Sequence, residues 1–212
     1  MPKAKSSRRT SYHHGNLREA LIDAAVQLVE EGGLDNVSVR EAAKRAGVSP
    51  GAPFRHFSNK TALMTAVAEQ AMSRFRSEIT KAVEHVATDD PIERFAAVGV
   101  AYLRWAIRNP THFQIISTRS LIDWDNSESL RHDNEAVRSL VEGSMAEAQR
   151  RNLLRSDNIA ETQIAARALV YGLARMCIDG HFAQWAVAGH TAERTAEDAL
   201  KHFVTLIGNN GT

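Results

Sequence analysis

The chain has 212 residues and a formal net charge of +1, with 26 basic and 25 acidic residues. This length allows one small module and one larger hydrophobic core. There is no N-terminal segment of signal-peptide type, and no apolar run approaches the roughly 18 residues of a membrane span, so we expect a soluble, cytoplasmic protein. A single cysteine, Cys177, excludes an intrachain disulfide framework and a thiolate metal cluster.

The charge is unevenly distributed along the chain. Residues 1–60 contain ten Lys or Arg against six Asp or Glu, a net charge of +4, whereas residues 61–212 contain sixteen against nineteen, a net charge of −3. A basic N-terminal segment followed by an acidic C-terminal segment is typical of a DNA-binding module attached to a domain that does not bind DNA.

Residues 1–15 lack apolar periodicity and carry their basic side chains on a Ser-rich background, which predicts a disordered basic arm. Such an arm either neutralises phosphates or enters the minor groove of DNA, or it is only a solvated tail. The sequence leaves both interpretations open. Adjacent His13 and His14 lack the fixed geometry of a metal site.

Residues 16–62 are predicted to form a three-helix domain. Asn16 and Glu19 mark the start of the first helix, and Gly32 marks its end. Ser38 and Glu41 form a capping box, so a second helix begins at Val39.

Gly47 supplies the left-handed residue that ends the second helix, and Ser49 is expected to cap a third, with Pro50 at its first position. Two short helices joined in this way are a helix-turn-helix, whose second helix lies in the major groove of DNA. Gly51 and Ala52 would then approach the bases closely, with methyl contact to thymine as the readout. Arg40 and Arg55 are the candidates for contact with guanine.

Residues 63–212 are predicted to form a larger helical domain, which gives an all-α chain of about nine helices. Asn59 caps a long helix from Lys60 to His85. Further helices are expected at residues 92–108, 112–118, 129–151, 159–182 and 192–207.

Large aromatic side chains in this domain are accompanied by a few polar groups, the combination that a small-molecule pocket needs. The opposing interpretation, which is favoured for any single residue, is ordinary core packing. The candidates for the pocket are Tyr102, Trp105, Phe113, Trp124, Arg175 and His181.

The last two helices place small residues beside large ones, a pattern that permits close helix packing. The residues that carry this pattern include Ala165, Ala168, Gly172, Ala196, Leu200 and Phe203.

From Tyr12 to Met64 the chain resembles the TetR family of one-component transcriptional regulators. The resemblance rests on YHHGNLREAL and on VSPGAPFRHFSNKTAL, in which the Gly-Val-Ser turn, the aromatic-Arg-His-Phe sequence and the following Lys occur together and in order. The segment at 167–172 is similar to a Trp-x-x-x-His-Gly pattern of one branch, with Arg167 and Tyr171 in the Trp and His positions.

The resemblance implies a homodimeric repressor, with an N-terminal helix-turn-helix and a C-terminal ligand-binding and dimerisation domain, that a small-molecule effector releases from a double-stranded DNA operator. It also implies a four-helix dimer interface made by the last two helices of each subunit. Arg40 matches a base-contacting position, and Ser38, Phe54 and Lys60 match phosphate-contacting positions. Phe54 replaces the usual tyrosine, so it either touches the DNA backbone without a hydroxyl or packs in the core. The full set of DNA-contact candidates is Ser38, Arg40, Ser49, Gly51, Ala52, Phe54, Arg55, His56 and Lys60.

Two alternatives remain at this stage. The first is a DNA-binding activator, or a regulator without a small-molecule trigger. The second is a helical enzyme that uses the histidines of the larger domain. Because no His-x-x-x-His or Glu-x-x-His spacing and no nucleophile motif occur, we expect no enzyme activity, no metal and no cofactor.

Overall fold

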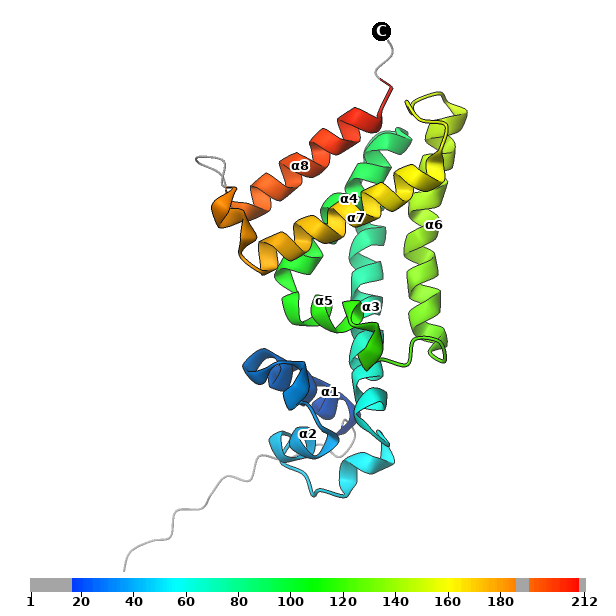
Figure 1. The fold of residues 1–212 in the computed structure, drawn as a ribbon. Helices are drawn as coiled ribbons and strands as arrows, with labels where there is room; N and C mark the ends of the chain where they lie inside the picture. The colour runs from blue at the N-terminus through cyan, green and yellow to red at the C-terminus, as the bar shows by residue number, and fades with distance from the viewer. Residues whose placement is uncertain (1–16, 186–190, 210–212) are drawn as a thin grey trace, which may run out of the picture. The chain divides into compact units, whose positions relative to one another are not determined.

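The computed structural model describes residues 17–185 and 191–209. Within these ranges every regular element is a helix and no β-strand occurs, so the prediction of an all-α fold is confirmed (Figure 1). The α-helices are α1 (Leu17–Gly32), α2 (Val39–Arg45), α3 (Lys60–Glu84), α4 (Pro91–Arg108), α5 (Pro110–Ser117), α6 (Glu128–Arg150), α7 (Ile159–Ile178) and α8 (Ala192–Ile207). Short 3-10 helices are η1 (Leu34–Asn36), η2 (Ala52–Arg55), η3 (Arg119–Leu121) and η4 (His181–Gln184). No helix in the described ranges is long and apolar enough to span a bilayer.

The chain divides into two compact units between Met64 and Thr65. The predicted arm at residues 1–15 lies outside the described residues. In the first unit, α1 buries one apolar face, and Leu21, Ile22 and Ala25 are completely shielded from solvent. This face packs against α2.

The helix α2 begins and ends as its sequence predicts. The Ser38 hydroxyl accepts a hydrogen bond from the backbone N–H of Glu41 at 3.1 Å, and the helix starts at Val39. At the other end, Gly47 has φ +69, a conformation that costs a residue with a Cβ roughly 1–2 kcal/mol. The small side chains of Ala42, Ala43 and Ala46 are all buried, which allows close packing of α2 in this unit.

In the second unit, α4 packs against α6, α7 and α8 (Figure 1). It supplies two rings, Tyr102 and Trp105, of an aromatic cluster that also contains Phe75 of α3 and Phe113 of α5. The Phe75 ring lies 5.3 Å from the Tyr102 ring and 5.0 Å from the Trp105 ring, and Tyr102 meets Phe113 edge to face at 6.0 Å. Edge-to-face pairs of this kind stabilise a core by about 0.5–1.5 kcal/mol beyond the area that they bury.

The absence of a side chain at Gly99 lets α8 approach α4 closely. A Cβ built at Gly99 would lie 2.9 Å from Cδ2 of Leu200, which is buried on α8. Along the same two helices, the Arg104 guanidinium donates two hydrogen bonds to the buried carboxylate of Glu197, at 2.6 and 3.0 Å.

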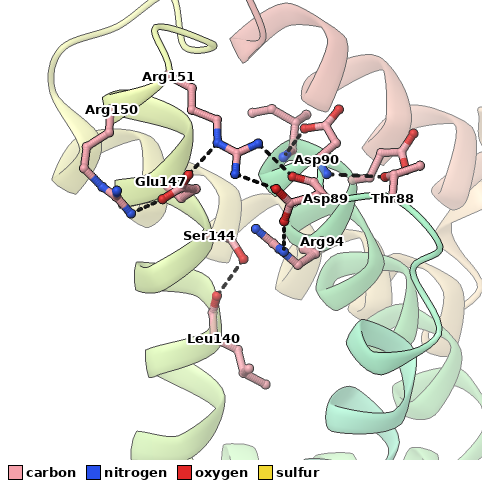
Figure 2. Close-up of polar contacts among 11 residues, drawn as sticks. Thr88, Asp89, Asp90, Arg94, Leu140, Ser144, Glu147, Arg150 and Arg151 are labelled. Atoms are coloured by element: carbon pink, nitrogen blue, oxygen red, sulfur yellow. Dashed lines mark hydrogen bonds and ion pairs between the residues drawn. The ribbon is translucent and has the colours of Figure 1, made fainter.

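Asp89, which precedes α4, connects the start of α4 to the end of α6. Its carboxylate accepts hydrogen bonds from Arg94 at 3.1 Å and from Arg151 at 2.8 Å, and Arg151 also donates to Glu147 (Figure 2). The hydrogen bond from Arg151, followed by the one from Arg94, lowers the pKa of Asp89 below its usual value. Asp89 therefore stays ionised in the folded protein at a pH where an unfolded chain would begin to take up a proton.

Cys177 is half-buried on α7, and its S–H group donates to the backbone carbonyl of Ala192 at 3.6 Å. Burial raises the pKa of the thiol, and the negative charge of Glu193 raises it further. Because only the thiolate is strongly nucleophilic, this environment suppresses the reactivity of the side chain.

Candidate functional site

The second helix of the predicted helix-turn-helix differs from expectation. An α-helix capped by Ser49 was expected, but residues 50 and 51 form a turn and only a single 3-10 turn, η2, follows. The N-cap residue of η2 is Gly51 and not Ser49, and no side chain caps this turn. The predicted capping role of Ser49 is therefore wrong. Pro53 gives the physical reason, because it has no N–H to donate and its ring disfavours a regular helix around it.

Within the first unit, the candidate DNA-contact residues do not share one environment. Arg40, on α2, and Arg55, in η2, are exposed and have no ion-pair partner among the residues that the structure describes. Phe54 is 46% exposed, so it is not part of the core. Ser49, Gly51 and His56 are also exposed, whereas Ser38, Ala52 and Lys60 are half-buried.

Gly51 has no structural reason to be a glycine. Its backbone has φ −86 and ψ −21, an ordinary right-handed conformation, and a Cβ at this position would meet nothing within 4 Å. Any residue could therefore occupy the position as far as the chain itself is concerned. A glycine in such a place is consistent with the close approach of another molecule.

Two basic side chains of this unit have internal partners that the sequence did not reveal. Nζ of Lys60 donates to the backbone carbonyl of Leu34 at 2.7 Å, which ties the first turn of α3 to η1. Arg45 lies on α2 among outward-facing cations, but its guanidinium binds both carboxylate oxygens of Glu31 on α1, one of them at 2.6 Å. Arg45 therefore connects α1 to α2 and is a less suitable DNA contact than Arg40.

In the second unit, the predicted pocket residues fall into separate groups. Tyr102, Trp105 and Phe113 are buried in the aromatic cluster around Phe75. Trp124 is half-buried beneath Arg119, whose Cζ lies 3.3 Å from the centre of the indole.

The remaining two pocket candidates, Arg175 and His181, belong to neither group. Arg175 is paired with Asp179 at 2.8 Å, and His181 is exposed in η4. The sequence analysis did not assign Arg167 to the pocket, but its Cζ lies 4.9 Å from the centre of the Tyr102 ring. Burial raises the pKa of Tyr102, and the charge of Arg167 partly opposes this rise.

A surface groove of about 450 Å³ opens beside Trp105, the one predicted pocket residue among its lining residues. Its other lining residues come from α3 and from the end of α4, and they are mostly charged: Arg74, Ser77, Glu78, Lys81, Arg108 and Asn109. Among the residues that the structure describes, no group of three or more His, Cys, Asp or Glu side chains could hold a metal ion.

The predicted dimer-interface residues are divided between α7 and α8. On α7, Ala165 and Ala168 are exposed, and a Cβ added to Gly172 would meet nothing within 4 Å. On α8, however, Ala196 and Leu200 are buried within their own chain. Phe203 packs partly against the core cluster of Phe95, Met145 and Ala166, so the exposed part of the predicted interface lies on α7.

Comparison with known proteins identifies related regulators. The alignment with the uncharacterised regulator YvdT of Bacillus subtilis shows 34% identity over 61 residues, but it spans only 29% of this chain and 31% of that protein. The transcriptional regulator BetI of Escherichia coli is 26% identical over 196 residues, which cover 89% of this chain and 92% of BetI. A solved structure of a protein of unknown function from Rhodococcus sp. RHA1 has a TM-score of 0.76 and 26% identity, and it covers 94% of this chain and 100% of that one.

Two family profiles match the chain. Residues 21–67 match the profile described as bacterial regulatory proteins of the tetR family, and residues 95–203 match a tetracyclin repressor-like C-terminal domain. The first match contains α2 and η2, which carry the exposed arginines, and the second alone covers about half of the chain. The chain therefore belongs to the TetR family of DNA-binding transcriptional regulators, which are not enzymes.

Proposed function

We propose that this regulator is a repressor, that it binds its operator as a homodimer, and that a small molecule bound in the second unit releases it from DNA. The observation that carries the DNA-binding part is the state of Arg40, Arg55 and Gly51. The two arginines are exposed without an ion-pair partner among the described residues, and the glycine is required neither by backbone conformation nor by packing. All three features are accounted for if DNA is the missing partner.

In this proposal Arg40 and Arg55 supply base readout, and residues around them contact phosphates. A two-fold dimer would present two such segments about one helical turn apart, roughly 34–36 Å, on a near-palindromic site. The half-buried Lys60 retains two N–H donors beyond its bond to Leu34, so it can still contribute to phosphate binding.

The homodimer is supported by uncovered apolar surface near the end of the chain. On α7, Ile164 is 70% exposed and Ala165 and Ala168 are also exposed, and on α8 Leu206 is 54% exposed. Large apolar side chains that remain open to solvent together are typical of a surface that another protein covers. A second copy of this chain, packed with α7 against its own counterpart, would cover them.

The effector would act by binding one state of the dimer more tightly than another. It can shift the population only by the ratio of its affinities for the state that fits the operator and the state that does not. We place the ligand against the aromatic cluster around Tyr102 and Phe113, because aromatic side chains with a few polar groups suit small organic ligands.

The dimer can be tested with Ala168→Glu, which places a charge on the exposed face of α7. Light scattering should show a dimer for the unmodified protein and a monomer for the variant, with a parallel loss of operator binding. Ala146→Glu, at an exposed position on α6, is the matched control and should leave both properties unchanged. A dimer that survives Ala168→Glu would contradict the proposed interface.

Repression is tested by a reporter under the promoter next to the gene of this regulator. Lower reporter output in the presence of the protein supports repression, and higher output would support the alternative of an activator. Output that does not respond to any small molecule would favour a regulator without an effector.

A further inference from the structure

The groove beside Trp105 lies between two helices of the second unit that contact each other directly. The Phe75 ring of α3 lies 5.0 Å from the Trp105 ring of α4, centre to centre. Residues i, i+3, i+4 and i+7 share one face of a helix. The lining residues of α3 have this spacing: Arg74, Ser77, Glu78 and Lys81. The other side of the groove is the last turn of α4, with Trp105 and Arg108, and the Asn109 that follows it.

The charge of this groove is opposite to that of the unit that contains it. Its lining has three cations, Arg74, Lys81 and Arg108, against one carboxylate, Glu78, which leaves a net charge of +2. Residues 61–212 as a whole have sixteen Lys or Arg against nineteen Asp or Glu, a net charge of −3. Positive charges that gather in a groove of a negatively charged domain favour an anionic ligand.

The three cations of the groove keep N–H groups that no other part of the chain uses. In the described part of the second unit, every arginine except Arg74 has a carboxylate, a backbone carbonyl or an aromatic ring as a partner. Arg108 uses one of its five N–H donors, to the carbonyl of Arg104 at 3.0 Å. Lys81 is paired with Glu78 at 3.7 Å, but both side chains are exposed and such a pair contributes little to stability.

A phosphate monoester matches this set of donors better than a carboxylate does. It carries a charge of about −1.5 to −2 near neutral pH and has three strong acceptor oxygens, one for each cation. A carboxylate carries one charge and two oxygens. A guanidinium can bind two phosphate oxygens at once, and a lysine ammonium binds as a point charge. The net charge of +2 is therefore close to what a phosphate monoester would neutralise.

The volume of the groove leaves room for an organic group attached to the phosphate. Its volume of about 450 Å³ lies in the range of small-molecule sites, roughly 300–1,000 Å³, and is larger than a single inorganic ion needs. The aliphatic parts of the Arg and Lys side chains offer apolar surface to such a group.

From this groove we propose that the second unit binds a small phosphate monoester between α3 and α4, through Arg74, Lys81 and Arg108. The site shares only Trp105 with the aromatic cluster against which we place the effector. The inference goes beyond the proposed function and does not depend on it, because the phosphate ligand would bind whether or not an effector releases the protein from DNA.

The experiment compares phenyl phosphate with phenyl sulfate by calorimetric titration of the full-length protein, at pH 8 and constant ionic strength, in a buffer free of both anions. The two probes have the same shape and three terminal oxygens, but at this pH the phosphate carries about two charges and the sulfate one. Phenyl phosphate should bind at least about tenfold more tightly than phenyl sulfate. Inorganic phosphate should bind more weakly than phenyl phosphate, because it lacks the organic group.

Substitutions in the groove should change the affinity in opposite directions. Arg74→Gln and Arg108→Gln should each weaken phenyl phosphate binding about tenfold. Glu78→Gln removes the opposing charge and should strengthen binding about two- to fivefold, a gain that partial unfolding cannot produce. Arg138→Gln and Glu135→Gln make the same charge changes on α6, where the two residues pair at 2.8 Å, and should leave the affinity unchanged.

The proposal is overturned if phenyl phosphate does not bind, if phenyl sulfate binds equally well, or if Glu78→Gln fails to strengthen binding. It is also overturned if the α6 variants change the affinity as much as the groove variants do. Inorganic phosphate that binds as tightly as phenyl phosphate would contradict the assignment of a monoester. Thermal unfolding of each variant shows whether it has folded.

The DNA backbone is the other source of phosphate that such cations could contact. A phosphodiester carries one charge per phosphate, so the net charge of +2 in a single groove favours the monoester. Without phenyl phosphate, Arg74→Gln and Arg108→Gln should therefore bind the operator as well as the unmodified protein does. An equal loss on operator and random DNA, with a weaker dependence on salt, would assign the groove to DNA and overturn the proposal. Neither result bears on the release of the protein from DNA by the effector.

Discussion

Replacing Gly51 by alanine tests whether this glycine is required for folding or for DNA recognition. The position has φ −86 and ψ −21, and a new Cβ would meet nothing within 4 Å. Alanine adopts this conformation without strain and has fewer conformations to lose on folding, so the free energy of unfolding should rise by about 0.4–1 kcal/mol. A stability measurement alone would therefore classify the substitution as harmless.

Operator binding should respond in the opposite direction. If Gly51 lies against base edges, the added methyl group fills space that the DNA occupies, and overpacking of a tight contact costs about 1–3 kcal/mol. This loss corresponds to a rise in Kd of roughly 5- to 150-fold. Fluorescence anisotropy with a labelled operator duplex measures the change, and thermal unfolding of the same sample measures stability.

Two other glycines serve as controls. Gly143→Ala, at an open position on α6, should stabilise the protein by up to about 1 kcal/mol and leave operator affinity unchanged. Gly47→Ala should destabilise it by roughly 1–2 kcal/mol, because its φ of +69 strains a residue with a Cβ. If Gly51→Ala bound the operator as well as the unmodified protein does, the assignment of η2 to the DNA surface would be refuted.

Other substitutions test the remaining parts of the description. Arg40→Ala should weaken operator binding by about 1–3 kcal/mol and relax the preference at one base pair, as measured by competition with single-base variants. Lys60→Ala should weaken binding to all sequences and reduce the slope of log Kd against log salt by about one, and equal losses of both variants on operator and random DNA would contradict this division. Gly99→Ala should lower the free energy of unfolding by about 1 kcal/mol, because its Cβ would press on Leu200, and the double substitution with Leu200→Ala should show less than additive loss. Asp89→Asn should flatten the fall in the free energy of unfolding at acid pH. The lowered pKa of Asp89 contributes stability that is present above roughly pH 4 and is lost as the pH falls through the folded-state pKa. Urea titrations that show the same acid dependence in the variant would contradict this.

Features determined by residues close in sequence were predicted well. The cap at Ser38, the start of α2 at Val39 and the left-handed Gly47 all match the structure, because each depends on a hydrogen bond or a backbone angle within a few residues. The predicted start of α4 was also nearly correct, since Asp90 caps it by accepting from the N–H of Ile92 and Pro91 occupies its first position.

Predictions failed where a local signal was underweighted. A helix was expected to continue through residues 159–182, but α7 ends at Ile178 and Gly180 follows with φ +74. After Gly47, a regular helix capped by Ser49 was expected, but Pro53 lies within it and the structure instead has the single 3-10 turn η2. The first error followed apolar periodicity past a glycine, and the second followed a capping pattern past a proline.

The environment of the charged residues was beyond prediction because it depends on partners far along the chain. Arg167 reaches Tyr102 from another helix, and Arg45 reaches Glu31 from α2 to α1. Nothing in the local pattern distinguishes Arg45, which has an internal partner, from Arg40, which has no ion-pair partner among the described residues.

The sheltered thiol of Cys177 makes this protein convenient for spectroscopy. It is the sole cysteine of the chain, and its raised pKa slows its reaction with maleimides near neutral pH. A cysteine introduced at an exposed position such as Lys44 would accept a spin label or a fluorophore preferentially. The distance between two such labels, one on each subunit of a dimer, would report the separation of the two DNA-binding segments before and after an effector is added.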